Sequence, residues 1–184
     1  MNQAIEKPEY YEDKVITAFI VCSVIWALFG MLAGLYAAAE LVWPSLNANI
    51  PEISFGRLRT VHTNVVLFGF GVSALMATSF YSVQRTSHVR LFAPGLAWNL
   101  FFGWQLMLVL GVMSLFLGAN GGKEYAEFEW IFDIAITVLW ISYAIVFFGT
   151  LATRRIKPIY ISNWFYGAFI IVVAMLHVVN NLAI

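Results

Sequence analysis

The stretch VITAFIVCSVIWALFGMLAGLYAAA, residues 15–39, carries no charged side chain from end to end. A helix needs roughly 20 apolar residues to cross a hydrocarbon core of about 30 Å. The stretch is therefore long enough to cross a bilayer as one helix. It exceeds the apolar segment of a secretory signal peptide, and the residues before it mix acidic and basic side chains, so we do not expect it to be cleaved.

Four further apolar runs of similar length follow the first. The chain is 61% hydrophobic and 11% charged, whereas soluble domains are about 45–50% apolar and about 25% charged. Ten-residue segments of alternating polarity, which are typical of membrane β-barrels, do not occur. The sequence predicts an all-α integral membrane protein in which residues 1–184 form a single domain in the lipid bilayer. Its five transmembrane helices are expected at about 15–39, 60–84, 93–118, 130–153 and 159–182.

Charge and cysteine content exclude several classes of protein. The formal net charge is zero, so no basic surface remains to meet phosphates, and we expect no nucleic-acid partner. The single cysteine, Cys22, excludes an intrachain disulfide and a cluster of thiolate ligands.

The basic residues between the runs predict the orientation of the chain. With the N-terminus inside, the outer segments hold only Arg57, Arg59 and Lys123. The positive-inside rule therefore favours an inner N-terminus and an outer C-terminus. The inner segments then hold the other seven, Lys7, Lys14, Arg85, Arg90, Arg154, Arg155 and Lys157.

A histidine and two arginines gather where the second run begins. His62 lies about one turn into that run, and ionisable residues at this depth are functional-site candidates. Arg57 and Arg59 stand just before it, and Gly69 follows on the face of His62 at helical spacing. A haem would use His62 as an axial ligand, Gly69 for clearance and the two arginines for its propionates. The alternative is a histidine hydrogen-bonded between helices, beside a glycine that permits close packing.

The segment between the third and fourth runs is acidic. Glu124 and Glu127 could hold a hard cation such as Ca²⁺, which takes six to eight oxygen ligands. The segment cannot supply that many, so other chains or haem propionates would complete the shell. The alternative is a solvated acidic loop.

Two other histidines differ in their setting. His88 lies in an inner loop and is most simply a solvated residue. His177 lies in the outer half of the fifth run, at a depth comparable with that of His62. For His177 an interhelical hydrogen bond, assisted by Asn180 or Asn181, is favoured over haem ligation.

Several segments together identify a family. Phe55-Gly56-Arg57-Leu58-Arg59 leading to His62-Thr63-Asn64 resembles the second-helix haem motif of the cbb3-type cytochrome c oxidase catalytic subunit, a haem–copper oxidase. The segments Tyr81-Ser82-Val83-Gln84-Arg85-Thr86, Lys123-Glu124-Tyr125-Ala126-Glu127 and Leu176-His177-Val178-Val179-Asn180-Asn181 are similar to that family as well. The likeness extends through nearly the whole chain. Nitric oxide reductase large subunits are similar at His-Thr-Asn, and the Lys-Glu-Tyr-Ala-Glu segment favours the cbb3 branch.

The resemblance implies a function and a set of site residues. The family reduces O₂ with electrons from cytochrome c and pumps protons, in the bacterial inner (cytoplasmic) membrane. His62 would be an axial ligand of low-spin haem b, and Arg57 and Arg59 would contact its propionates. Glu124 matches a carboxylate at a calcium site, and Glu127 is its neighbour. The resemblance also implies c-type cytochrome subunits as partners. This chain cannot carry a c-type haem itself, because it has no Cys-x-x-Cys-His motif.

The resemblance also implies that the chain is incomplete. The family's catalytic subunit is a bundle of about twelve helices, of which this chain would be the N-terminal five. High-spin haem b3, CuB and the second haem b ligand are expected only in the remaining helices, so we expect no catalytic residue here and no O₂ reduction by this chain alone. Two alternatives remain from the residues themselves: a free-standing haem-binding or assembly protein using His62 with His177, and a small ion transporter using Asp133, His62 and the glutamates.

Overall fold

The computed structural model describes residues 11–123 and 126–182, and within these ranges it contains helices and no strand. The α-helices are α1 (Asp13–Val42), α2 (Phe55–Asn64), α3 (Ser73–Ser87), α4 (Pro94–Leu117), α5 (Trp130–Ala152) and α6 (Ile161–His177). Two 3-10 turns, η1 (Pro44–Asn47) and η2 (Pro51–Ile53), follow α1. The π-helical segments η3 (Val65–Val72) and η4 (Val178–Leu182) continue α2 and α6.

Five helical rods in the described residues are long and apolar enough to cross a membrane, as the sequence predicts. The second rod joins α2, η3 and α3 without a break. The rods are Asp13–Val42, Phe55–Ser87, Pro94–Leu117, Trp130–Ala152 and Ile161–Asn181.

The second rod begins earlier than predicted. Its first residue is Phe55, so Arg57 and Arg59 lie inside the helix and not before it. The sequence predicts that the helix begins only after these two charged residues. An arginine near a helix end, however, can keep its guanidinium at the membrane interface while its stem packs on apolar surface. His62 therefore lies about two turns from the start of the helix, at 3.6 residues per turn.

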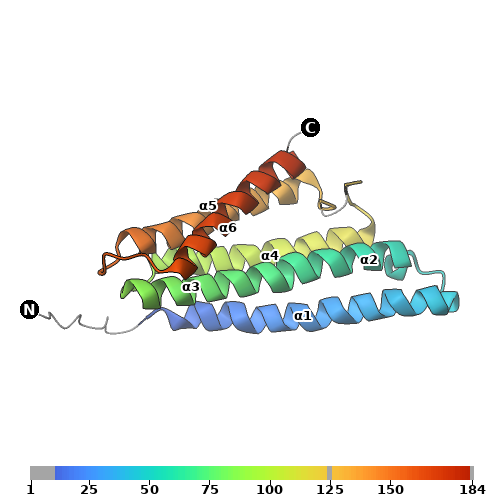
Figure 1. The fold of residues 1–184 in the computed structure, drawn as a ribbon. Helices are drawn as coiled ribbons and strands as arrows, with labels where there is room; N and C mark the ends of the chain where they lie inside the picture. Colours follow the sequence, from blue (N-terminus) through green and yellow to red (C-terminus); the bar gives the residue numbers. More distant parts are fainter. Residues whose placement is uncertain (1–10, 124–125, 183–184) are drawn as a thin grey trace, which may run out of the picture.

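The rods form a bundle with the second rod at its centre (Figure 1). α1 runs along one side of that rod, and α5 and α6 lie on the other side, with α6 inclined to its neighbours. The core between the rods is aromatic, and two of its large side chains have their polar groups hydrogen-bonded within the bundle. Tyr143 donates its hydroxyl hydrogen to Ser79 Oγ at 2.7 Å, and Trp140 Nε1 donates to Ile170 O at 2.9 Å. Internal partners are required because lipid offers none.

Ion pairs tie the start of α1 to the end of α3 and the loop that follows it. Arg85 Nη2 lies 2.9 and 2.8 Å from the two oxygens of Asp13, and Arg90 pairs with Glu12. This end carries the charges that the sequence assigns to the inner side, and we call it the inner end. The opposite end, with Arg57, Arg59 and Lys123, is called the outer end.

Candidate functional site

His62 lies on α2 and faces α1. Its Nδ1 is 2.8 Å from the backbone oxygen of Gly30, and the ring passes so close to Gly34 that a Cβ there would lie 2.5 Å from Nδ1. The imidazole therefore fits against α1 only because Gly34 has no side chain.

The contact with Gly30 decides the tautomer of His62. A carbonyl oxygen can only accept a hydrogen bond, so Nδ1 carries the proton. In the neutral imidazole the lone pair is then on Nε2. A histidine that ligates a metal usually donates its other ring N–H to a carbonyl or carboxylate in this manner, which fixes the ring and raises its basicity.

The small-residue face below His62 packs on α1. A Cβ on Gly30 would meet Val66 Cγ2 at 2.9 Å, and one on Gly69 would meet Trp26 Cβ at 2.9 Å. The predicted haem clearance at Gly69 gains no support from this geometry, because the Trp26 side chain fills the adjoining space. Trp26 is held there by a hydrogen bond from Nε1 to Gln105 Oε1 at 2.8 Å.

The two arginines point to different parts of the bundle. Arg57 Nη1 donates to the backbone oxygen of Phe116 at 2.7 Å, near the C-terminus of α4, and lies 3.5 Å from Glu52. Arg59 instead shares with His62 a hollow of about 370 Å³ between α1 and α2, whose other walls include Gly34 and Phe55. The structure thus brings His62 and Arg59 together and places Arg57 at the end of α4.

Glu127 connects the acidic loop to the helix that carries His62. Its side chain is buried, at 3% exposure, and its Oε2 accepts a hydrogen bond from Asn64 Nδ2 at 3.1 Å. Its Oε1 is also buried but has no hydrogen-bond partner. Glu124 lies outside the described residues. Within residues 11–123 and 126–182 no three His, Cys, Asp or Glu side chains gather as a metal-binding group, so a cation here would need ligands from elsewhere.

His177 is engaged in an interhelical contact. Its Nε2 lies 3.0 Å from the backbone oxygen of Asp133 on α5, and Asn181 Nδ2 donates to Asp133 Oδ1 at 3.0 Å. This arrangement is the one favoured from the sequence. His62 bonds to α1 and His177 bonds to α5, so the geometry gives no support to a haem held between these two histidines.

The sequence matches the family described as Cytochrome C and Quinol oxidase polypeptide I over residues 14–184. The chain belongs to this family. It is 57% identical over 174 residues to the cbb3-type cytochrome c oxidase subunit CcoN1 of Stutzerimonas stutzeri, which covers 95% of the chain and 37% of that protein. It is 46% identical over 181 residues to cytochrome c oxidase subunit 1 of Rhodobacter capsulatus, covering 97% of the chain and 34% of that protein.

The predicted resemblance to the cbb3-type oxidase subunit is thereby confirmed. The chain spans about a third of the length of these curated subunit I relatives. The all-helical fold with five membrane-spanning rods is consistent with a part of an oxidase subunit I.

Two residues that bear on the site are not among those that the sequence predicts. Gly30 supplies the backbone oxygen that bonds His62, and Gly34 supplies the space for its ring. Their spacing, Gly-x-x-x-Gly in an apolar helix, is a known signal for close approach of two helices. That signal could have identified the partner of the small-residue face.

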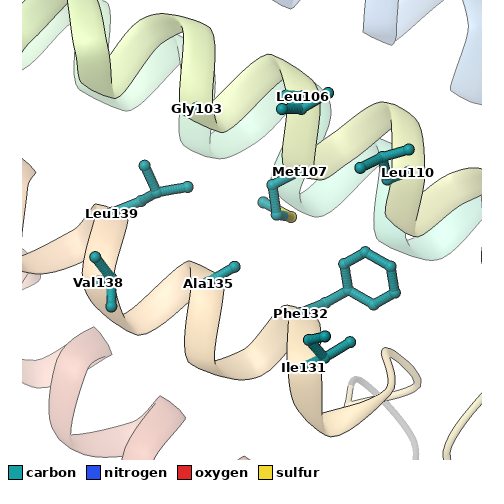
Figure 2. A pocket seen from close by; sticks show the side chains of 9 residues that line it. All are labelled: Gly103, Leu106, Met107, Leu110, Ile131, Phe132, Ala135, Val138 and Leu139. Atoms are coloured by element: carbon teal, nitrogen blue, oxygen red, sulfur yellow. The ribbon is translucent and has the colours of Figure 1, made fainter.

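A second hollow is lined by apolar residues. It has a volume of about 560 Å³ and lies between α4 and α5, where Met107, Phe132 and Leu139 line the gap (Figure 2). No side chain along it has an ionisable or hydrogen-bonding group of ordinary strength.

Proposed function

We propose that the chain is the part of a cbb3-type haem–copper oxidase catalytic subunit that holds low-spin haem b. The haem would carry electrons from cytochrome c toward O₂ reduction that is coupled to proton pumping. The setting would be the bacterial inner membrane, because the relatives are bacterial oxidase subunits.

One observation carries this proposal. His62 is oriented by Gly30, with its proton on Nδ1 and its Nε2 left as the ligand atom, in a hollow that also contains a cation, Arg59. A histidine that served only to join helices would not need a cationic neighbour of this kind. Haem b would supply one-electron transfer, and this chain would supply an axial ligand and a charge that binds a propionate.

The proposed roles of the remaining haem residues are unequal. Arg59 lines the hollow of His62 and is the better placed of the two propionate partners. Arg57 could reach a propionate only if its guanidinium gave up the hydrogen bond to the backbone oxygen of Phe116, or if it bonded to that oxygen and to the propionate at once. Gly69 acts here in helix packing against Trp26.

Arg59→Gln is expected to lower the midpoint potential of the low-spin haem in the assembled oxidase. A nearby cation favours the reduced haem, so its removal should lower the potential by roughly 30–60 mV, a three- to tenfold change in a one-electron equilibrium. Spectroelectrochemical titration measures this shift.

Arg57→Gln is the matched control for that titration. It should leave the haem potential nearly unchanged. It should lower the free energy of unfolding by about 1 kcal/mol, because the carbonyl of Phe116 loses its hydrogen-bond donor. The opposite result, a shift for Arg57→Gln and none for Arg59→Gln, would place the propionates away from the hollow.

We also propose a Ca²⁺ ion at the acidic loop, held by Glu124 with Glu127 as a second candidate ligand. The buried and unpartnered Oε1 of Glu127 supports this, because a buried carboxylate oxygen without a donor is costly unless a proton or a cation meets it. The alternative of a solvated loop fits Glu127 poorly, since its side chain is only 3% exposed.

The proposed partners are the other helices of the catalytic subunit and c-type cytochrome subunits. Those helices would bind high-spin haem b3 and CuB and would supply the second axial ligand of haem b. α1 and α6 present large apolar side chains outward, among them Leu35 at 68% and Phe165 at 73% exposure, which further helices could cover. The relatives named above are cytochrome c oxidase subunits, which favours an oxidase over a nitric oxide reductase.

A further inference from the structure

The π-helical segment η3 begins directly after the helix that carries His62. α2 ends at Asn64, η3 covers Val65–Val72, and the rod then continues as α3. At the junction the N–H of Val65 bonds to the backbone oxygens of both His62 and Val61. π-Helical turns are rare, occur mostly as single turns and are frequent at functional sites. η3, with eight residues, is longer than a single turn and adjoins the candidate ligand.

Two buried side chains from neighbouring rods donate hydrogen bonds to backbone oxygens of η3. Trp104 Nε1, on α4, lies 3.3 Å from Phe68 O, and Ser23 Oγ, on α1, lies 3.2 Å from Phe70 O. Trp104 and Ser23 are 0% and 3% exposed, so the described part of the chain itself encloses both donors. A buried donor in a bilayer has no water to bond and depends on its protein partner.

Gly69, in the same segment, packs against a third side chain. A Cβ on Gly69 would lie 2.9 Å from Trp26 Cβ, and Trp26 Nε1 donates to Gln105 Oε1 of α4 at 2.8 Å. α1 and α4 thus contact η3 at three successive residues, Phe68, Gly69 and Phe70. These contacts oppose rotation of η3 about its own axis.

The rotation of η3 sets the direction in which His62 points. Successive residues of an α-helix lie about 100° apart around the axis, and the i→i+5 bond of a π turn encloses one residue more than an α turn does. Each residue gained or lost by the π turns therefore rotates α2 by about 100° relative to α3. Such a rotation would carry His62 away from Gly30 and Gly34. α3 would stay in place through the hydrogen bond between Ser79 and Tyr143.

We propose that Trp104 and Ser23 are positioning residues for low-spin haem b, because they hold η3 in the rotation that directs His62 to Gly30. This proposal rests on the proposed role of His62 as an axial ligand. Both residues act through the backbone of η3 on the orientation of the imidazole and on its hydrogen bond. Contacts outside the ligand set tune a bound metal by fixing the orientation and basicity of the ligand in this way.

Trp104→Phe in the assembled oxidase removes the Nε1 donor and retains an aromatic ring. The imidazole plane of His62 should turn, and its hydrogen bond to Gly30 should weaken. A less basic ligand stabilises ferric haem less, so the midpoint potential of low-spin haem b should rise. We expect a change of about threefold in the one-electron equilibrium, or about 30 mV at 59 mV per tenfold. The largest g-value in the electron paramagnetic resonance spectrum of the ferric haem should also shift, because it depends on the orientation of the axial ligand planes.

Trp140→Phe is the matched control. Trp140 is also buried, and its Nε1 donates to Ile170 O at 2.9 Å, but Ile170 belongs to the regular helix α6. The control removes the same donor and the same volume without removing a hydrogen bond to η3. The potential and the g-value should therefore stay those of the unmodified complex.

Ser23→Ala repeats the test with a smaller change, in case Trp104→Phe does not assemble. It should raise the haem potential by less than Trp104→Phe does. Ser142→Ala is its control, because the Ser142 hydroxyl bonds to Val138 O within α5, and it should leave the potential unchanged.

Amide hydrogen exchange of residues 65–72, followed by mass spectrometry, reports on η3 independently of the haem. Exchange should be faster in Trp104→Phe than in Trp140→Phe. Equal exchange would show that Trp104 does not hold η3, and faster exchange with an unchanged potential and g-value would show that η3 does not direct His62. Either result would overturn the proposal. Failure of the haem assignment itself is seen separately, as a low-spin haem b spectrum that survives His62→Gly.

Discussion

Gly34→Ala is expected to remove most of the low-spin haem b from the assembled oxidase, although residue 34 would not touch the haem iron. The added methyl group would lie 2.5 Å from Nδ1 of His62. This is shorter than any contact between non-bonded heavy atoms of this kind, so the imidazole must move. Movement breaks the hydrogen bond to Gly30. Loss of such a partner typically costs 10- to 100-fold in metal affinity. Haem b per complex, measured by pyridine haemochrome and by the reduced-minus-oxidised spectrum, should fall accordingly.

Gly56→Ala provides the control for this substitution. A Cβ at Gly56 meets nothing within 4 Å, so the same chemical change on α2 should leave the haem content unaltered. A Gly34→Ala complex with a full complement of low-spin haem would mean that the position of His62 against α1 is unimportant for the cofactor.

Glu127→Gln is expected to abolish the stabilisation of the assembled oxidase by Ca²⁺. The amide oxygen of glutamine can still accept the hydrogen bond from Asn64, but the charge that meets the cation is lost. A ligand at 100 times its Kd stabilises the state that binds it by about 2.7 kcal/mol. Thermal unfolding with Ca²⁺ and with a chelator should therefore differ for the unmodified complex and coincide for the variant.

Glu129→Gln, in the same loop, should retain the difference between Ca²⁺ and chelator. A Ca²⁺ response that survives Glu127→Gln would argue against Glu127 as a ligand. An unmodified complex that is indifferent to the chelator would argue against the calcium site itself.

The five membrane spans were predictable because length and hydropathy are local properties of the sequence. The start of the second rod was not, since the charges of Arg57 and Arg59 predict a boundary where the structure continues the helix. That boundary also concealed their separation. Residues two apart on a helix lie about 200° apart around its axis, so once both belong to α2 they cannot face the same neighbour.

The partner of the small-residue face was the other point that the sequence left open. Spacing placed His62 and Gly69 on one face, but whether a haem or a helix covers that face is a matter of tertiary packing. In the structure α1 covers it, with Trp26 beside Gly69 and Gly34 beside His62. The buried carboxylate of Glu127 was likewise hidden, because an acidic loop is usually solvated and only the fold shows its contact with Asn64.

The visible spectrum of the assembled oxidase carrying His62→Gly, recorded before and after addition of imidazole, tests the ligand role of His62 most directly. We predict that the low-spin haem b signal is lost and that imidazole restores it by occupying the vacated ligand position. His177→Gly, whose side chain bonds Asp133, should keep the signal throughout. A low-spin haem b spectrum that persists in His62→Gly without imidazole would contradict the assignment of His62 as an axial ligand.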